Sequence, residues 1–137
     1  MNAKRYLHNL YCDDVRQEVG NKSSLIGVYG PDMLIKTTDQ EAEVRICAVS
    51  SLSIPTDDPV NVIHFTIRLD EKILQEFDQT RSGVQSSDGT NNIIFNSVAF
   101  LRFQTKTDCE LNVSARMDNG AIEYGQSLRI RILRSSD

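Results

Sequence analysis

Apolar and polar residues alternate with a period of two along several stretches of the chain. In residues 61–69, for example, Ile63, Phe65 and Ile67 fall on one face of an extended segment. This alternation is typical of a β-strand that packs one face against a core. The same pattern recurs in residues 43–49, 111–118 and 128–132.

The remaining apolar runs predict further strands and the turns between them. Residues 92–105 are apolar on both faces, which favours a central strand that is covered on both sides, and a bulge would explain its change of phase. Asp118-Asn119-Gly120 predicts a hairpin with a type I′ turn. Asp70-Glu71 predicts a second hairpin, and Gly30-Pro31-Asp32 breaks the chain between two apolar runs.

Together these elements predict an all-β fold made of one domain, residues 1–137. About nine short strands joined by frequent turns favour a single antiparallel β-sandwich of the immunoglobulin-like kind. An open barrel is the alternative. Periodicity does not determine the order of the strands.

Residues 13–20, DDVRQEVG, are the one segment with helical signals. Asp14 can cap a helix, Gln17 stands three residues later as in a capping box, and Gly20 can end the helix in a left-handed conformation. We therefore expect a short helical turn here, between strands at residues 5–12 and 22–29.

Residues 78–92, DQTRSGVQSSDGTNN, are polar and rich in serine, glycine and aspartate. A loop of this length is unusual inside a compact domain and is commonly functional. We expect either a mobile excursion or an interaction loop.

Composition narrows the classes of partner. The formal net charge of −4 argues against a general nucleic-acid-binding protein, which carries a basic surface. Three widely spaced cysteines form a poor disulfide framework and indicate free thiols in a reducing compartment. The sequence shows neither a signal-peptide pattern nor an apolar run of membrane-spanning length. We expect a cytoplasmic location, or a virion if a phage encodes the chain, and no membrane partner.

The most distinctive stretch is residues 11–29, YCDDVRQEVGNKSSLIGVY. It resembles the opening motif of a family of small bacterial and phage β-sandwich proteins of unknown function. The resemblance implies a bacterial or phage origin and a β-sandwich, but no particular reaction. The matching positions are Cys12, Asp13, Asp14, Arg16, Glu18, Gly20, Lys22, Ser24, Leu25, Gly27 and Tyr29.

Two groups of residues are candidates for binding. The first lies in the motif, where a carboxylate pair and neighbouring charges could serve a site or could simply stabilise a chain crossover. The second lies near the C-terminus, where two arginines share a strand face and could hold a small anionic ligand or line a solvated surface. The candidates are Asp13, Asp14, Arg16, Glu18, Lys22, Arg129 and Arg131.

The sequence signals for phosphate binding, metal binding and catalysis are weak. Gly20 to Ser24 includes a Lys-Ser pair but lacks the spacing of a phosphate-binding loop. Closely paired cysteine or histidine ligands are absent, so we expect no metal and no cofactor. Catalysis through Cys12 would require an accessible thiol with a lowered pKa.

These observations rank three functions. We expect a non-catalytic binding module whose partner is a protein, either a different protein or a second copy of the chain. The first alternative is a structural or accessory component of a phage particle or another assembly. The second is a hydrolase or transferase that uses Cys12 and Asp14.

Overall fold

The computed structural model describes residues 5–20, 22–81, 86–87 and 92–134, which form eleven strands and no helix. The all-β prediction is therefore confirmed. The strands are β1 (Tyr6–Glu18), β2 (Lys22–Val28), β3 (Asp32–Thr37), β4 (Ala42–Pro55), β5 (Val62–Leu69), β6 (Lys72–Thr80), β7 (Ser86–Ser87), β8 (Asn92–Thr105), β9 (Cys109–Met117), β10 (Ile122–Tyr124) and β11 (Leu128–Arg134).

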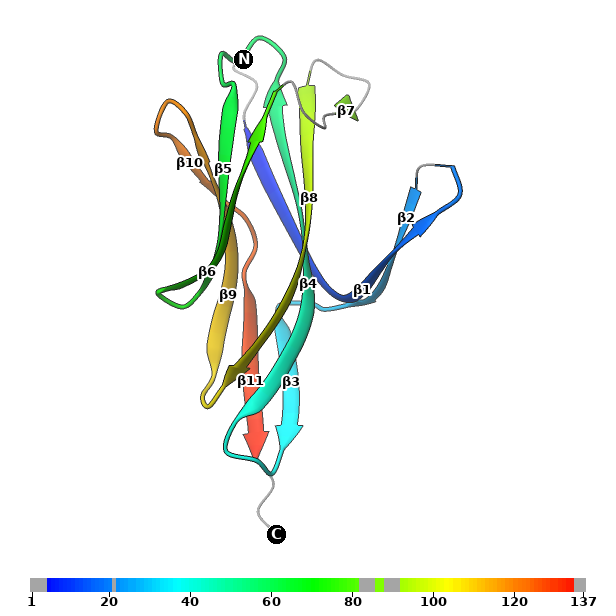
Figure 1. Ribbon diagram of the computed structural model, residues 1–137, viewed down its shortest axis with the longest axis vertical. Coiled ribbons are helices and arrows are strands. Elements are labelled where there is room, and N and C mark those ends of the chain that lie inside the picture. The colour runs from blue at the N-terminus through cyan, green and yellow to red at the C-terminus, as the bar shows by residue number, and fades with distance from the viewer. Residues whose placement is uncertain (1–4, 21, 82–85, 88–91, 135–137) are drawn as a thin grey trace.

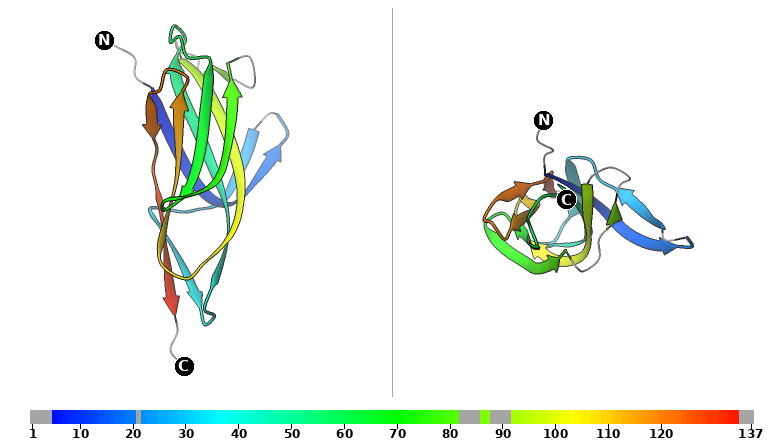
Figure 2. Two further views of the ribbon diagram at one scale, coloured as in Figure 1. Left: turned by 60° about the vertical axis from the view of Figure 1, so that its left-hand side comes forward. Right: turned by 90° about the horizontal axis from the view of Figure 1, so that it is seen from above.

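The strands form two sheets (Figure 1). The first has the order β2-β1-β4-β8-β7, and the second has the order β3-β11-β9-β5-β6, with β10 paired to β9. Figure 2 shows the two sheets enclosing a common interior, with β1 beginning at one end of the molecule and β11 ending at the other. This arrangement is a two-layer β-structure with a single core.

The core is built from the alternating positions that the sequence pattern identifies. On β5, Ile63, Phe65 and Ile67 are fully buried, and on β4 the inward positions include Val44 and Leu52. Residues from both sheets belong to one apolar cluster, so burial of apolar surface holds the two layers together.

One pair of strands departs from the antiparallel prediction. β3 and β11 run parallel, with Met33 opposite Ile130 and Ile35 opposite Ile132, while the other pairings are antiparallel. These two strands are distant in sequence, so no short hairpin dictates their relative direction. The second sheet is consequently mixed.

The helical turn expected over residues 13–20 is wrong, because Asp13–Glu18 continue strand β1. Val15 lies opposite Leu25, and Arg16 lies opposite Ser24 on β2. Pairing with a complementary strand outweighed the local capping signals, which are only weak preferences. Gly20, with a φ of 88°, serves the β1–β2 turn instead of ending a helix.

The β1–β2 hairpin projects from the body of the molecule (Figures 1 and 2). The first half of β1, Tyr6–Cys12, pairs with β4, and among the strands that the structure describes its second half pairs only with β2. We call residues 13–20 and 22–28 the arm. The core cluster contains no residue from the arm.

The turn and loop predictions have mixed outcomes. Asp70, with a φ of 52°, does lie in a hairpin turn between β5 and β6. The turn at Asp118–Gly120 joins β9 to β10 as predicted, but only Gly120 has a positive φ, so a three-residue loop replaces the type I′ turn.

The polar loop expected at residues 78–92 is shorter than predicted. Residues 78–80 belong to β6, Asn92 begins β8, and residues 86–87 pair with β8 as β7. Residues 82–85 and 88–91 lie outside the described residues. Across the described ranges, no helix has the length and apolar character needed to cross a membrane.

Candidate functional site

The charged motif residues gather on one face of the arm. Asp14, Arg16 and Glu18 alternate along β1, and Lys22 and Ser24 face the same side from β2. Arg16 lies 3.6 Å from an oxygen of Asp14, and the Ser24 hydroxyl donates to Glu18 at 3.1 Å. These side chains are largely solvated, so their mutual attraction contributes little stability. The structure thus brings these candidate residues together on an open surface.

Asp13 lies on the opposite face of the arm and has a different environment. The Tyr29 hydroxyl donates to Oδ1 of Asp13. Burial, reinforced by this carboxylate, raises the pKa of Tyr29 to about 12. Gly27, with a φ of 67°, lies directly against the Asp13 side chain, where an added Cβ would approach Oδ2 to 2.3 Å. Asp13 therefore stabilises the base of the arm.

The arm also exposes apolar side chains and one strand edge. Val19, Val28 and Ile26 are 92%, 52% and 39% exposed. Among the described residues, β1 is the only strand that pairs with β2, so the other edge of β2 is open. Residues 23–28 carry neither a charge nor a proline, which are common means of blocking an open edge. The arm is therefore well suited to contact another chain.

Two buried thiols lie where the arm leaves the sheet. Cys12 on β1 is opposite Cys47 on β4, and their side chains are 0% and 2% exposed. The Cys12 thiol contacts the carbonyl of Asp14 at 3.4 Å, and the Cys47 thiol contacts that of Asp13 at 3.7 Å. Burial raises the pKa of both thiols, that of Cys47 to about 11. A thiol that must act as a nucleophile needs the opposite environment.

The C-terminal arginines are not part of the arm. Arg129 and Arg131 share the solvent face of β11, as predicted, and Arg129 lies 3.5 Å from Asp32. Arg102 is on β8 in the other sheet, where it contacts Glu43. The structure brings Asp14, Arg16, Glu18 and Lys22 together, with Asp13 on the reverse side, and leaves the two arginines elsewhere.

A buried polar network, not foreseen from the sequence, connects the two sheets beside the arm. Asn9, 2% exposed, donates to the carbonyls of Val113 (2.9 Å) and Gln126 (3.1 Å) and accepts from Ser50 (2.8 Å). The Tyr11 hydroxyl donates to the same Gln126 carbonyl at 2.7 Å. The sequence offers one sign of this network, because Asn9 occupies an inward position between Leu7 and Tyr11 in an alternating strand. Such a satisfied network favours one alignment of the two layers.

A hollow of about 440 Å³ lies next to this network. Its lining includes His8, Leu10, Tyr29, Pro31 and Gln126, so it lies between the first half of β1 and the crossover into β3, beside the base of the arm. It is mainly apolar and lacks a convergent set of ionised groups in its lining.

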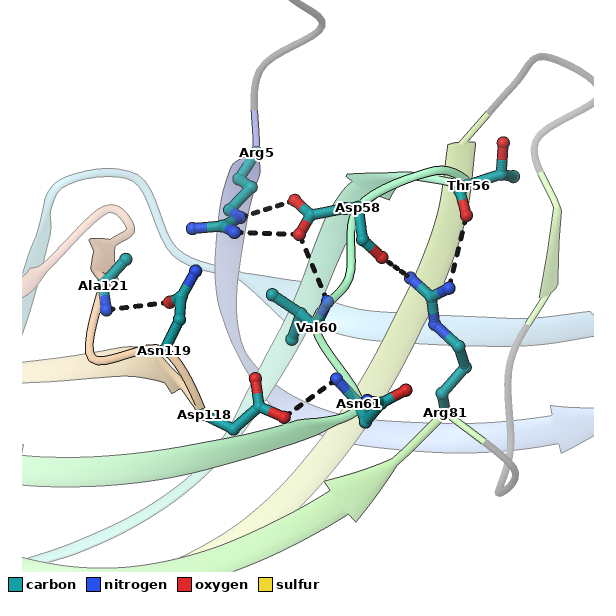
Figure 3. Close-up of polar contacts among 9 residues, drawn as sticks. All are labelled: Arg5, Thr56, Asp58, Val60, Asn61, Arg81, Asp118, Asn119 and Ala121. Atoms are coloured by element: carbon teal, nitrogen blue, oxygen red, sulfur yellow. Dashed lines mark hydrogen bonds and ion pairs between the residues drawn. The ribbon is translucent and has the colours of Figure 1, made fainter.

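Among the ion pairs of the described residues, the one most shielded from solvent lies at the end of the molecule where β1 begins (Figure 3). Arg5 donates to both oxygens of Asp58, at 2.7 and 2.9 Å, and this contact holds the pKa of Asp58 below its usual range. Arg81 donates to the carbonyls of Asp58 and Thr56. Asp118 accepts from the backbone of Asn61 at 3.1 Å. The Asp58 carboxylate thus ties the start of β1 to the β4–β5 loop.

The described residues contain no group of three or more metal-ligating side chains arranged to hold an ion. His64 on β5 forms a small group of ionisable side chains with two residues of β6. Its ring nitrogens lie 2.5 Å from Asp78 and 3.1 Å from Glu76. The hydrogen bond to Asp78, followed by that to Glu76, raises the pKa of His64. These contacts are ordinary cross-strand pairs between β5 and β6 on an exposed face of the sheet.

Comparison with known proteins adds no relationship: no family model matches the chain, and no curated protein and no solved structure matches it.

Proposed function

We propose that this protein is a non-catalytic binding module that engages a protein partner through the arm. The observation that carries the proposal is the arm itself, a two-stranded projection with an open edge and exposed apolar side chains. It is formed by the motif that makes the sequence distinctive. The origin in bacteria or phage and the immunoglobulin-like class belong to the same proposal.

The energetics of the arm support a partner. A two-stranded hairpin is at best marginally stable by itself, because it buries little apolar surface. An extended segment added to the open edge of β2 would supply backbone hydrogen bonds and cover Ile26 and Val28. Binding of this kind needs no catalytic residue.

The same edge also supports the second candidate, a component of a phage particle or other assembly. An unblocked edge strand can pair with a second copy of the chain as readily as with a different protein. The hydrolase or transferase candidate receives no such support, since the Cys12 thiol is fully buried and its pKa is raised.

Site-specific photo-crosslinking in the cell that makes the protein tests the proposal. A photo-reactive amino acid at Val19, the most exposed apolar residue of the arm, is compared with the same group at Ile122, which is 45% exposed on β10. We expect a discrete crosslinked product from position 19 only, and Ile26→Lys should reduce it roughly tenfold by placing a charge at the docking edge.

The crosslinked product also distinguishes the candidates. A product with a different protein supports the binding module, and a product with a second copy supports the assembly component. Equal products from both positions, or a product that Ile26→Lys leaves unchanged, would contradict docking through the arm.

A further inference from the structure

We propose that Cys12 and Cys47 are a modification site, a thiol pair that forms a reversible cross-strand disulfide at the base of the arm. The inference does not rest on the proposed function, because it concerns the chemistry of two residues in this chain alone.

The register brings the two thiols together. Cys12 and Cys47 are directly opposed in the β1–β4 pairing. Opposed residues in antiparallel strands have Cα atoms about 4.5 or 5.5 Å apart, and disulfides span Cα separations of roughly 4.4–6.8 Å. Either Cα separation therefore lies within the range that a disulfide spans.

Both thiols also lie on the same face of the sheet. Tyr11 on β1 and Ile46 and Ala48 on β4 face the core, so the intervening Cys12 and Cys47 face outward. Each thiol contacts a carbonyl of the arm, that of Asp14 for Cys12 and that of Asp13 for Cys47. Cys109, the third cysteine, is on β9 in the other sheet.

The arm controls access to the pair. The thiols face outward yet are buried, and the backbone of Asp13 and Asp14 lies against them. Because the arm contributes nothing to the core cluster, its base can open at a lower free energy than the body of the protein. Oxidation would thus proceed through local opening of the arm.

A small disulfide such as oxidised glutathione is a sufficient oxidant. In the locally opened state, where the burial that raises its pKa is relieved, the thiolate of one cysteine attacks a glutathione sulfur, forming a mixed disulfide and releasing one glutathione thiolate. The thiolate of the other cysteine then attacks the protein sulfur of that mixed disulfide and releases the second glutathione. Two protein thiols are oxidised, one disulfide is reduced to two glutathione molecules, and the new bond joins β1 to β4.

The test is incubation of the full-length protein with oxidised glutathione, followed by unfolding, alkylation of free thiols and mass spectrometry. We expect one alkylated cysteine, Cys109, and a peptide pair linked through Cys12 and Cys47. Dithiothreitol should restore three alkylatable thiols. Three free thiols after prolonged oxidation, or a linkage that includes Cys109, would overturn the inference.

Single substitutions supply the matched controls. Cys12→Ser and Cys47→Ser should each stop at the mixed disulfide and carry one glutathione, whereas Cys109→Ser should form the internal bond at the wild-type rate. Circular dichroism identifies folded variants, and Cys→Ala versions replace any serine variant that fails to fold. An internal bond that persists in either of the first two variants contradicts the assignment.

Discussion

Close packing of the Asp13 side chain against the backbone of Gly27 helps to set the geometry of the arm. Gly27 has a φ of 67° and leaves no room for a side chain, because Asp13 occupies the space where a Cβ would lie. That arrangement lets Asp13 accept a hydrogen bond from the Tyr29 hydroxyl at the base of the arm. Gly27 is therefore required by both conformation and packing.

Gly27→Ala should loosen the arm without unfolding the body. The left-handed backbone and the clash with Asp13 together cost about 1–3 kcal/mol, so amide hydrogen exchange in the arm should accelerate by roughly tenfold or more. Gly30→Ala is the control, since its φ is not positive and a Cβ there meets nothing within 4 Å. Equal exchange in the two variants would show that Gly27 is not needed.

Among the elements, β1 has two roles. Its first half supplies core and network residues such as Leu7 and Asn9, and its second half has β2 as its only partner within the described part of the chain. The backbone N–H of Tyr29 donates to the carbonyl of Tyr11 at 2.8 Å, so the chain re-enters the body beside the point where it left. The arm is thus a hairpin extension whose two ends, at Tyr11 and Tyr29, lie side by side in space.

Excision of the arm should leave a folded body. Replacing residues 13–27 with Asn-Gly gives a four-residue connection, Cys12-Asn-Gly-Val28, between Tyr11 and Tyr29, a common hairpin length. Because the core cluster contains no arm residue, we expect a free energy of unfolding within about 1 kcal/mol of the full chain. Urea denaturation measures it, and a loss above about 3 kcal/mol would mean that the arm belongs to the folding unit.

At the scale of the whole molecule, polar contacts hold the ends of the sheets in place. The Arg5–Asp58 pair joins the start of β1 to the β4–β5 loop, and both side chains are mostly shielded from solvent. Two parallel hydrogen bonds with low exposure are stronger than the open pairs of the arm. The ion pair therefore closes one end of the layered structure.

Asp58→Asn should destabilise the protein by about 1–3 kcal/mol at neutral pH, because Arg5 loses its charged partner. Arg16→Gln, which removes a solvated pair, should cost less than about 0.5 kcal/mol. Urea denaturation of the three proteins gives both values. Equal stability of the two variants would contradict a structural role for Asp58.

This contribution depends on pH in a defined direction. The hydrogen bond to Arg5 lowers the pKa of Asp58 in the folded state, so the stabilisation is fully present above the unfolded pKa and disappears as pH falls through the folded pKa. The difference between wild type and Asp58→Asn should therefore shrink below about pH 4.

The sequence by itself determined the strands whose apolar residues alternate. Ile63, Phe65 and Ile67 in β5 are buried as the period of two predicts, and Asp70 turns the chain into β6. Alternation reports which face of a strand meets a core, so the all-β class and much of the core follow from it. The charged motif residues were named as binding candidates, and the structure places four of them on one face of the arm.

Only the tertiary structure decided what each strand pairs with. The capping signals at Asp14 and Gln17 favoured a helix, but β2 offered a complementary partner and the segment became a strand. The parallel β3–β11 pair and the opposition of Cys12 and Cys47 likewise depend on register between segments distant in the chain. Periodicity is a local property, whereas register is set by the packing of the whole molecule, and here that packing creates both the arm and the thiol pair at its base.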